Sequence, residues 1–241
     1  MMGIVPAAGL GTRMQPLAFS KELLPVGSRA DGERERPRAV GEYVVERLIA
    51  GGADRLCFVI SADKADIMSY FGSRVDGVPI CYVVQGRPSG LCDAVFSAVP
   101  FVAPNESVAV GLPDTVWFPH TGLRHLPEAT LSFLLFPVPS PELFDAVILD
   151  EHDRVLEIEV KCSKPRSSWV WGAFKIPPAD LARLHELWLR RDRCDQYFGT
   201  LVNAYLRTGG AAVGVKAGTA YVDVGTFNGY REALKLLTSP G

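Results

Sequence analysis

The sequence predicts an α/β fold of Rossmann-like type, in which a mostly parallel or mixed central sheet is flanked by helices on both faces. Two observations predict it. Apolar runs of strand length alternate with amphipathic helical segments through the first half of the chain. These runs, such as residues 55–61, are apolar along their whole length, which is typical of parallel strands covered on both faces. The second half mixes strand and helix patterns less regularly, so antiparallel neighbours are expected there.

The first half divides into four strands and three helices. We expect strands at 3–7, 55–61, 78–85 and 106–114, and helices at 38–52, 64–72 and 91–100. The first helix carries one apolar stripe and ends at a glycine pair, Gly51 and Gly52. The polar stretch at 27–41 has low hydrophobicity, and we expect an exposed loop.

The second half continues with strands at 130–138, 154–161, 167–176 and 211–216, and helices at 178–191, 196–210 and 227–237. Residues 151–153 are expected to form a hairpin turn before the second of these strands. No internal repeat or linker interrupts the chain. We therefore predict one domain over residues 1–241.

Composition excludes several classes of protein. The formal net charge of −2 leaves no basic footprint for nucleic acid, and no apolar run reaches the length of a membrane span. The five cysteines are odd in number and contain no C-x-x-C pair, which argues against a disulfide framework or structural zinc. No signal peptide is visible, and a cytoplasmic location is expected.

The loop after the first strand carries the strongest functional signal. Gly9, Gly11 and Thr12 leave backbone N–H groups free of bulky side chains, which suits phosphate oxygens. Arg13 and Lys21 would add two positive charges. A Rossmann fingerprint is excluded because Met14 stands at its third glycine position, and no Walker A string exists in the chain.

These residues resemble the signature loop of the sugar-1-phosphate nucleotidylyltransferases, the family of glucose-1-phosphate thymidylyltransferases and uridylyltransferases. The matching positions are Gly9, Gly11, Thr12, Arg13, Pro16, Lys21, Leu24 and Pro25. The interval from arginine to lysine is two residues shorter than is usual in that family. The resemblance implies the fold of the nucleotide-diphospho-sugar transferases, in a short catalytic-core form, because only about fifteen residues follow Thr226.

Further segments match the family in order. The resemblance implies that Ala8, Gly9, Gly11, Thr12, Gln85 and Gly90 bind the nucleotide, with Gln85 on the pyrimidine edge. It implies that Arg13, Lys21 and Lys161 are catalytic. Asp114 and Asp223, each after an apolar strand, would hold Mg²⁺.

The acceptor segment fits less well. Lys161 keeps the strand register and the spacing to Gly172, whereas Lys164 carries the adjacent proline, and Lys161 is favoured as the ligand of the acceptor phosphate. Glu159 is the nearest match to the glutamate that holds sugar hydroxyls, and Gly172 is placed beside the sugar. Asp195 and Gln196 lie near the expected second sugar-binding glutamate.

The resemblance implies transfer of a nucleotidyl group from a pyrimidine nucleoside triphosphate, dTTP or UTP, to a sugar 1-phosphate. Two alternatives remain open. The enzyme could be a cytidylyl- or other nucleotidylyltransferase acting on a non-sugar phosphate or phosphonate. It could also be a catalytically silent nucleotide-binding regulatory module, although such a module need not keep both aspartates.

Overall fold

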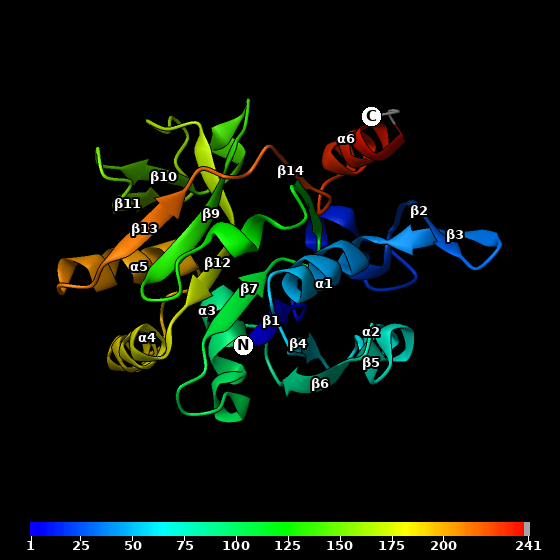
Figure 1. Ribbon diagram of the computed structural model, residues 1–241, viewed down its shortest axis with the longest axis horizontal. Coiled ribbons are helices and arrows are strands. Elements are labelled where there is room, and N and C mark those ends of the chain that lie inside the picture. The colour runs from blue at the N-terminus through cyan, green and yellow to red at the C-terminus, as the bar shows by residue number, and fades with distance from the viewer. Residues whose placement is uncertain (239–241) are drawn as a thin grey trace.

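A computed structural model describes residues 1–238 of the chain (Figure 1). Its centre is a ten-stranded sheet with the order β11-β10-β12-β7-β1-β4-β6-β5, in which β9 also pairs with β12, and β13 pairs with β9. The parallel part consists of β7 (Val108–Gly111), β1 (Met2–Pro6), β4 (Arg55–Ser61) and β6 (Val78–Gln85), and β5 (Arg74–Val75) runs antiparallel at its edge.

The other half of the sheet is mainly antiparallel. Strand β12 (Trp169–Ile176) pairs antiparallel with β7, β9 and β10, and joins the two halves. The remaining strands are β9 (Leu131–Pro137), β10 (Ala146–Leu149), β11 (Val155–Glu159) and β13 (Ala212–Val215). The α/β class with a mixed sheet is therefore confirmed.

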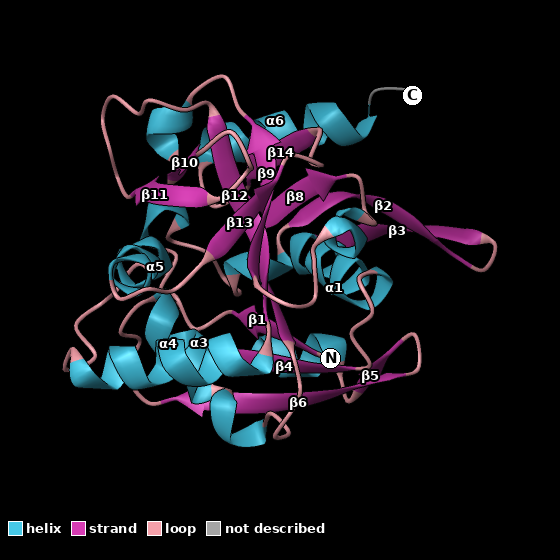
Figure 2. Ribbon diagram, turned by 60° about the vertical axis from the view of Figure 1, so that its left-hand side comes forward, coloured by secondary structure: helices cyan, strands magenta, loops and turns pink. Residues whose placement is uncertain are grey.

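Helices cover both faces of this sheet (Figures 1 and 2). Along β1, Ile4 joins a core with α3 (Leu91–Ser97), α4 (Pro178–Arg190) and α5 (Phe198–Arg207). Its neighbour Val5 joins the opposite core with α1 (Val40–Ala50) and α2 (Ala65–Phe71). Successive side chains of a strand point to opposite faces, which explains why the strand is apolar throughout.

Two short strands outside the main sheet decide the geometry of the site. Strands β8 (Thr115–Phe118) and β14 (Ala220–Asp223) form a separate antiparallel pair, although more than a hundred residues separate them in the chain. The last helix, α6 (Phe227–Thr238), packs against β14 and β2. Val116, Val222 and Val224 belong to the buried cluster beneath it.

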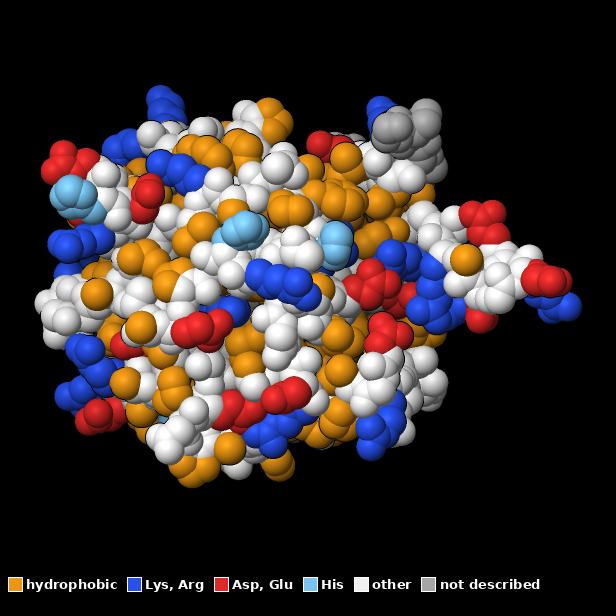
Figure 3. Space-filling view, in the orientation of Figure 1, with side chains coloured by type: hydrophobic (Ala, Val, Ile, Leu, Met, Phe, Trp, Pro, Cys, Tyr) orange, Lys and Arg blue, Asp and Glu red, His pale blue; other side chains and the backbone are white. Residues whose placement is uncertain are grey.

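The expectation of a loop at 27–41 is wrong. Strands β2 (Pro25–Asp31) and β3 (Arg34–Ala39) form a hairpin that projects from the body, with charged side chains at its tip (Figures 1 and 3). A two-residue loop joins the paired Asp31 and Arg34, and Gly32 takes the positive φ of 63° that such tight turns need. The hairpin was missed because both its faces are largely polar, so the apolar alternation that marks a strand is absent.

In the part of the chain that the structure describes, no helix combines the length and apolar character that a membrane crossing requires. The prediction of one domain over 1–241 stays a prediction, and its last residues, 239–241, lie outside the described part.

Candidate active site

The loop after β1 presents unpaired backbone donors. Ala7 N–H donates to Val59 at 2.7 Å, but no N–H of residues 8–13 donates to a protein acceptor within residues 1–238. Gly9 has open space around it, whereas Ala8 is buried. Thr12 and Arg13 lie in a single 3-10 turn, Thr12–Met14, and both are exposed. Such a row of free donors is suited to phosphate oxygens.

Gly11 lets a lysine cross the loop. It has a φ of 63°, and a Cβ there would lie 2.9 Å from Cδ of Lys21. The Lys21 side chain thus passes over the loop backbone, and its ammonium pairs with the carboxylate of Asp114. The shorter interval between Arg13 and Lys21 therefore still brings both cations to the same place.

The β8–β14 ladder brings the two predicted metal ligands together. Asp223 pairs in register with Thr115, the residue after Asp114, and the Val224 N–H donates to the Asp114 carbonyl at 2.8 Å. One carboxylate oxygen of each aspartate lies 2.8 Å from the point that a Cβ on Gly225 would occupy, and Arg13 lies 3.1 Å from it. The two carboxylates thus converge beside the loop, as expected from their positions after apolar strands.

Charges in this cluster compensate one another. Arg13 Nη1 lies 3.1 Å from Asp223 Oδ2, while Lys21 pairs with Asp114. Burial, together with the neighbouring Asp114 charge, raises the pKa of Asp223 above its ordinary value. Burial also works to raise the pKa of Asp114, but the Lys21 ammonium outweighs it and holds that pKa low. The site is therefore a set of opposed charges that a cation and a polyphosphate could enter.

A buried ion pair supports the loop from below, and sequence reasoning missed it. Lys64 Nζ lies 2.8 Å from Glu22 Oε1 and donates to the Ala7 carbonyl at the same distance. Both side chains are almost fully buried. Because Glu22 follows Lys21 directly, the pair fixes both ends of the phosphate loop. Lys64 follows β4, the sheet neighbour of β1, and lies 42 residues beyond Glu22 in the chain, so no local pattern marks it.

A cavity of about 150 Å³ adjoins the two aspartates. Lys161 lines it together with Arg13, Asp114 and Asp223, so the structure brings these predicted residues together. Asp145, which no sequence pattern marked, lines it too. The apolar lining consists of Leu112, Leu143, Phe144, Trp171 and Tyr221.

Asp145 and Lys161 are fixed to each other. The Lys161 N–H donates to Asp145 Oδ1 at 3.2 Å, and its Nζ lies 4.0 Å from the same oxygen. Lys161 has a φ of 50°, which is uncommon for a residue other than glycine. Burial raises the pKa of Asp145, although Lys161 opposes this. Lys164 is exposed and does not line this cavity.

Gly172 makes room for an aromatic ring. It stands in a bulge of β12, where the pairing with β9 shifts, and a Cβ there would lie 2.4 Å from the Tyr221 ring. Tyr221, which stands two residues before Asp223 on β14, also packs against Phe136 and Phe144. Gly172, which was predicted to bind the substrate, therefore makes room for the Tyr221 ring. Burial raises the pKa of the Tyr221 hydroxyl well above its ordinary value.

Two other carboxylates predicted near the acceptor are engaged elsewhere. Glu159 lies 2.6 Å from Arg166 Nε and also accepts the Arg166 N–H at 2.8 Å. Asp195 forms a two-pronged pair with Arg191, at 2.8 and 2.9 Å. Neither lines the cavity beside the aspartates. The binding role expected of Glu159 stays a prediction.

Gln85 and Gly90 lie on the same edge of the sheet as the phosphate loop. Gln85 is the last residue of β6, and its Nε2 donates to the carboxylate of Asp93. Gly90 precedes α3 with a φ of 103°, and a Cβ there would lie 2.5 Å from the Gln196 carbonyl oxygen. The close approach of Gln196 therefore requires glycine at this position.

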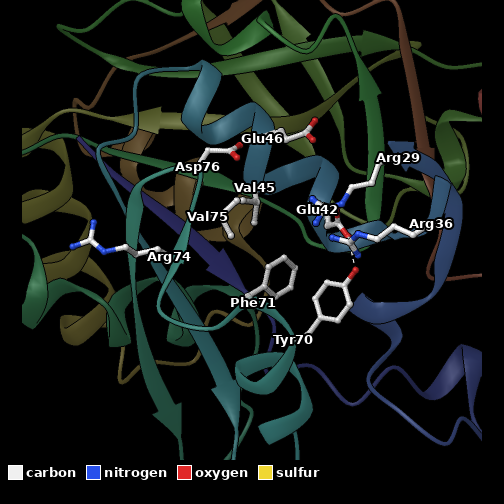
Figure 4. Close-up of a pocket in the computed structure, with 10 residues that line it drawn as sticks. All are labelled: Arg29, Arg36, Glu42, Val45, Glu46, Tyr70, Phe71, Arg74, Val75 and Asp76. Atoms are coloured by element: carbon white, nitrogen blue, oxygen red, sulfur yellow. Dashed lines mark hydrogen bonds and ion pairs between the residues drawn. The ribbon is translucent and has the colours of Figure 1, made fainter. Parts of the chain in front are cut away.

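A second cavity, of about 330 Å³, lies between α1, α2 and the β2–β3 hairpin and is separate from this cluster (Figure 4). Its charged lining is balanced, with three arginines (Arg29, Arg36, Arg74) and three acids (Glu42, Glu46, Asp76). Glu42 lies 2.8 Å from Arg29 and accepts the Tyr70 hydroxyl. These internal pairs stabilise the base of the β2–β3 hairpin and contain none of the predicted site residues.

Within residues 1–238, no group of three or more His, Cys, Asp or Glu side chains is placed to hold a metal ion. The pair Asp114 and Asp223 offers two carboxylates. This donor set fits Mg²⁺, which commonly takes one or two carboxylates and completes its shell with phosphate oxygens and water.

Comparison with known proteins identifies the family of the chain. Residues 2–239 match the family described as nucleotidyl transferase. Glucose-1-phosphate thymidylyltransferase from Mycolicibacterium smegmatis is 31% identical over 97% of this chain and 81% of its own length. The enzyme of the same name from Neisseria meningitidis is 28% identical, with the same coverage.

Solved structures share the fold. A Bacillus anthracis structure, described as a glucose-1-phosphate thymidylyltransferase in complex with sucrose, has a TM-score of 0.82 at 24% identity. It covers 100% of this chain and 97% of its own. The UTP-bound UGPase from Acinetobacter baumannii has a TM-score of 0.78 at 21% identity and covers 98% of this chain and 92% of its own. These structures confirm the fold, while the family match and the curated relatives confirm the family resemblance seen in the sequence.

Proposed function

Because the chain belongs to the nucleotidyl transferase family, we propose that it joins a pyrimidine nucleoside triphosphate, dTTP or UTP, to a sugar 1-phosphate and releases pyrophosphate. The observation that carries this proposal is the convergence of Asp114 and Asp223 on one point beside Arg13. The names of the two curated relatives support a sugar 1-phosphate as the acceptor and a thymidylyl group as the group transferred.

The reaction joins two polyanions, so its barrier is largely one of charge and position. An oxygen of the acceptor phosphate attacks the α-phosphorus of the triphosphate, and the bond to the β-phosphate oxygen breaks. Arg13 and Lys21 neutralise the triphosphate on the free N–H groups of residues 8–13, and Lys161 holds the attacking phosphate. The phosphate monoester is already anionic near neutral pH, so the site needs no general base.

Asp114 and Asp223 would hold Mg²⁺ in this arrangement. When bound, the ion would offset the charge of the phosphate oxygens. Lys21 and Arg13, which pair with the two aspartates here, would then turn to the phosphates. Each charged group would thus change its partner: the two carboxylates would bind Mg²⁺, and the two cations would bind the phosphates.

Asp145 would bind the hydroxyl groups of the acceptor. It is the carboxylate in the cavity that is not assigned to the metal, and Lys161, which would hold the acceptor phosphate, is bonded to it at 3.2 Å. Aromatic rings of Phe144, Trp171 and Tyr221 form the adjoining wall. A carboxylate beside aromatic rings suits the mixed polar and apolar faces of a sugar.

Pyrophosphate release tests the function directly. The protein is incubated with MgCl₂, each of five nucleoside triphosphates, and a panel of sugar 1-phosphates and non-sugar phosphates. Release with dTTP or UTP and a sugar 1-phosphate is the expected result. Release only with non-sugar phosphates or phosphonates would contradict the proposed acceptor. Nucleotide binding without release on the whole panel would identify a silent binding module and overturn the proposal.

A further inference from the structure

The amide of Gln85 has a fixed orientation. Its Nε2 donates to Oδ2 of Asp93, which lies in the first turn of α3. A carboxylate accepts hydrogen bonds and cannot donate them, so the NH₂ side of the amide must face Asp93. Gln85 is only 5% exposed, which restricts other rotamers. The amide oxygen Oε1 consequently points away from Asp93.

That oxygen is available to a ligand. Within the described residues 1–238, the hydrogen bonds of Gln85 include none in which Oε1 accepts. Oε1 can therefore accept a hydrogen bond but has nothing to donate. An acceptor of this kind, on a side chain that is only 5% exposed, favours a partner with an N–H and disfavours one with a lone pair, because the unmatched group loses its hydrogen bond to water.

The position of Gln85 suits a nucleobase. Strands β1, β4 and β6 are parallel neighbours, with Ser61 paired to Gln85 and Val59 paired to Pro6. The phosphate loop and Gln85 thus leave the same edge of the sheet, two strands apart, or about 10 Å. In open α/β sheets ligands bind across this edge. A triphosphate on the loop would extend its base toward β6.

We propose that Asp93 is a positioning residue that presents Gln85 as a hydrogen-bond acceptor and so selects uracil and thymine nucleotides over cytosine nucleotides. The proposal places Oε1 opposite N3 of the base, where uracil and thymine carry a donor and cytosine carries a lone pair. The amino group of cytosine could donate to Oε1 only if the base shifted out of that position. This inference rests on the proposed function, in which Gln85 contacts the edge of the base. It adds a reason for the choice of base, located in a residue that does not itself touch the nucleotide.

The test compares binding of UTP, dTTP and CTP, each with MgCl₂, by calorimetry on the full chain. The wild-type protein should bind UTP and dTTP more tightly than CTP by about 5- to 150-fold, the range expected for one mismatched buried acceptor. Asp93→Asn should reduce this ratio to within about threefold. An asparagine can donate as well as accept, so the Gln85 amide is free to turn over and offer its NH₂ group to cytosine.

Two further variants separate positioning from general damage. In Gln85→Glu/Asp93→Asn the carboxylate moves to position 85, where it can only accept, and the preference for UTP and dTTP should return. In Gln85→Ala the ratio should be small, and adding Asp93→Asn should not change it further. Melting temperatures of all variants are measured alongside, to show that each one folds.

Each outcome decides the matter. An unchanged ratio in folded Asp93→Asn would overturn the proposal, as would failure of the double variant to restore the preference. Equal binding of all three nucleotides by the wild-type protein would overturn the role of Asp93 while leaving nucleotide binding intact. Absence of binding by any nucleotide would contradict both this inference and the proposed function.

Discussion

The nucleotide side and the acceptor side of the site are built in different ways. On the nucleotide side, the loop after β1 and Gln85 at the end of β6 follow parallel strands directly. On the acceptor side, Lys161 and Asp145 flank the β10–β11 hairpin, and Gly172 stands in a bulge of β12. Loops that follow parallel strands all lie at the same edge of the sheet. The position of a side chain in a hairpin or a bulge instead depends on the register of strand pairing. Motifs therefore carry over well on the first side and poorly on the second.

Two ion pairs show the same contrast. Lys64 and Glu22 are nearly buried beneath the phosphate loop, and burial raises the pKa of Glu22. Arg166 and Glu159 also form a close pair on the acceptor side, but the Arg166 side chain is 61% exposed. A buried charge that loses its partner is costly, while an exposed pair contributes little. The nucleotide side should accordingly be the less tolerant of change.

The largest expected effect tests these pairs. Lys64→Met should lower the free energy of unfolding by about 3–5 kcal/mol, because it leaves Glu22 buried without a partner. Arg166→Met should lower it by no more than about 1 kcal/mol. Urea unfolding followed by circular dichroism measures both. Equal decreases in the free energy of unfolding of the two variants would show that the two sides of the site tolerate change equally.

The second prediction concerns Asp223, one of the two aspartates proposed to hold Mg²⁺. Asp223→Asn should reduce kcat by about 10²- to 10³-fold, because the site loses one of its two carboxylates for Mg²⁺. Pyrophosphate release measures the change. Glu151→Gln, an exposed residue of the β10–β11 turn, serves as the control and should retain full activity. Near-normal turnover of Asp223→Asn would exclude this residue from the reaction.

Matched variants test which residues bind the acceptor. Lys161→Ala and Asp145→Ala should each raise KM for the sugar 1-phosphate about 10- to 100-fold, because each removes a charged hydrogen-bond partner. The KM for the nucleotide should change little. Lys164→Ala is the control and should stay within about twofold. A larger effect of Lys164 than of Lys161 would reverse the assignment of the acceptor phosphate.

The last prediction concerns Gly172. Gly172→Ala should lower the free energy of unfolding by about 1–3 kcal/mol, since the added methyl group would collide with the Tyr221 ring. Because Tyr221 precedes Asp223 on β14, activity should fall as well. Thermal melting and pyrophosphate release measure the two effects. A rise in acceptor KM with unchanged stability would instead show direct contact between Gly172 and the sugar.

The sequence by itself determined the fold class, which the structure confirms, and it predicted one candidate site that contains Arg13, Lys21, Asp114 and Asp223. Apolar strands alternate with helices along the chain, and the four site residues lie in segments that resemble the motifs of one family. Only the tertiary structure decided which side chains complete the site. Lys64 and Asp145 carry no local signal, and their roles arise from where separate strands end and pair. The polar β2–β3 hairpin was missed for a related reason. Each strand is stabilised by pairing with the other through a turn, and its own sequence lacks the apolar alternation that predicts a strand.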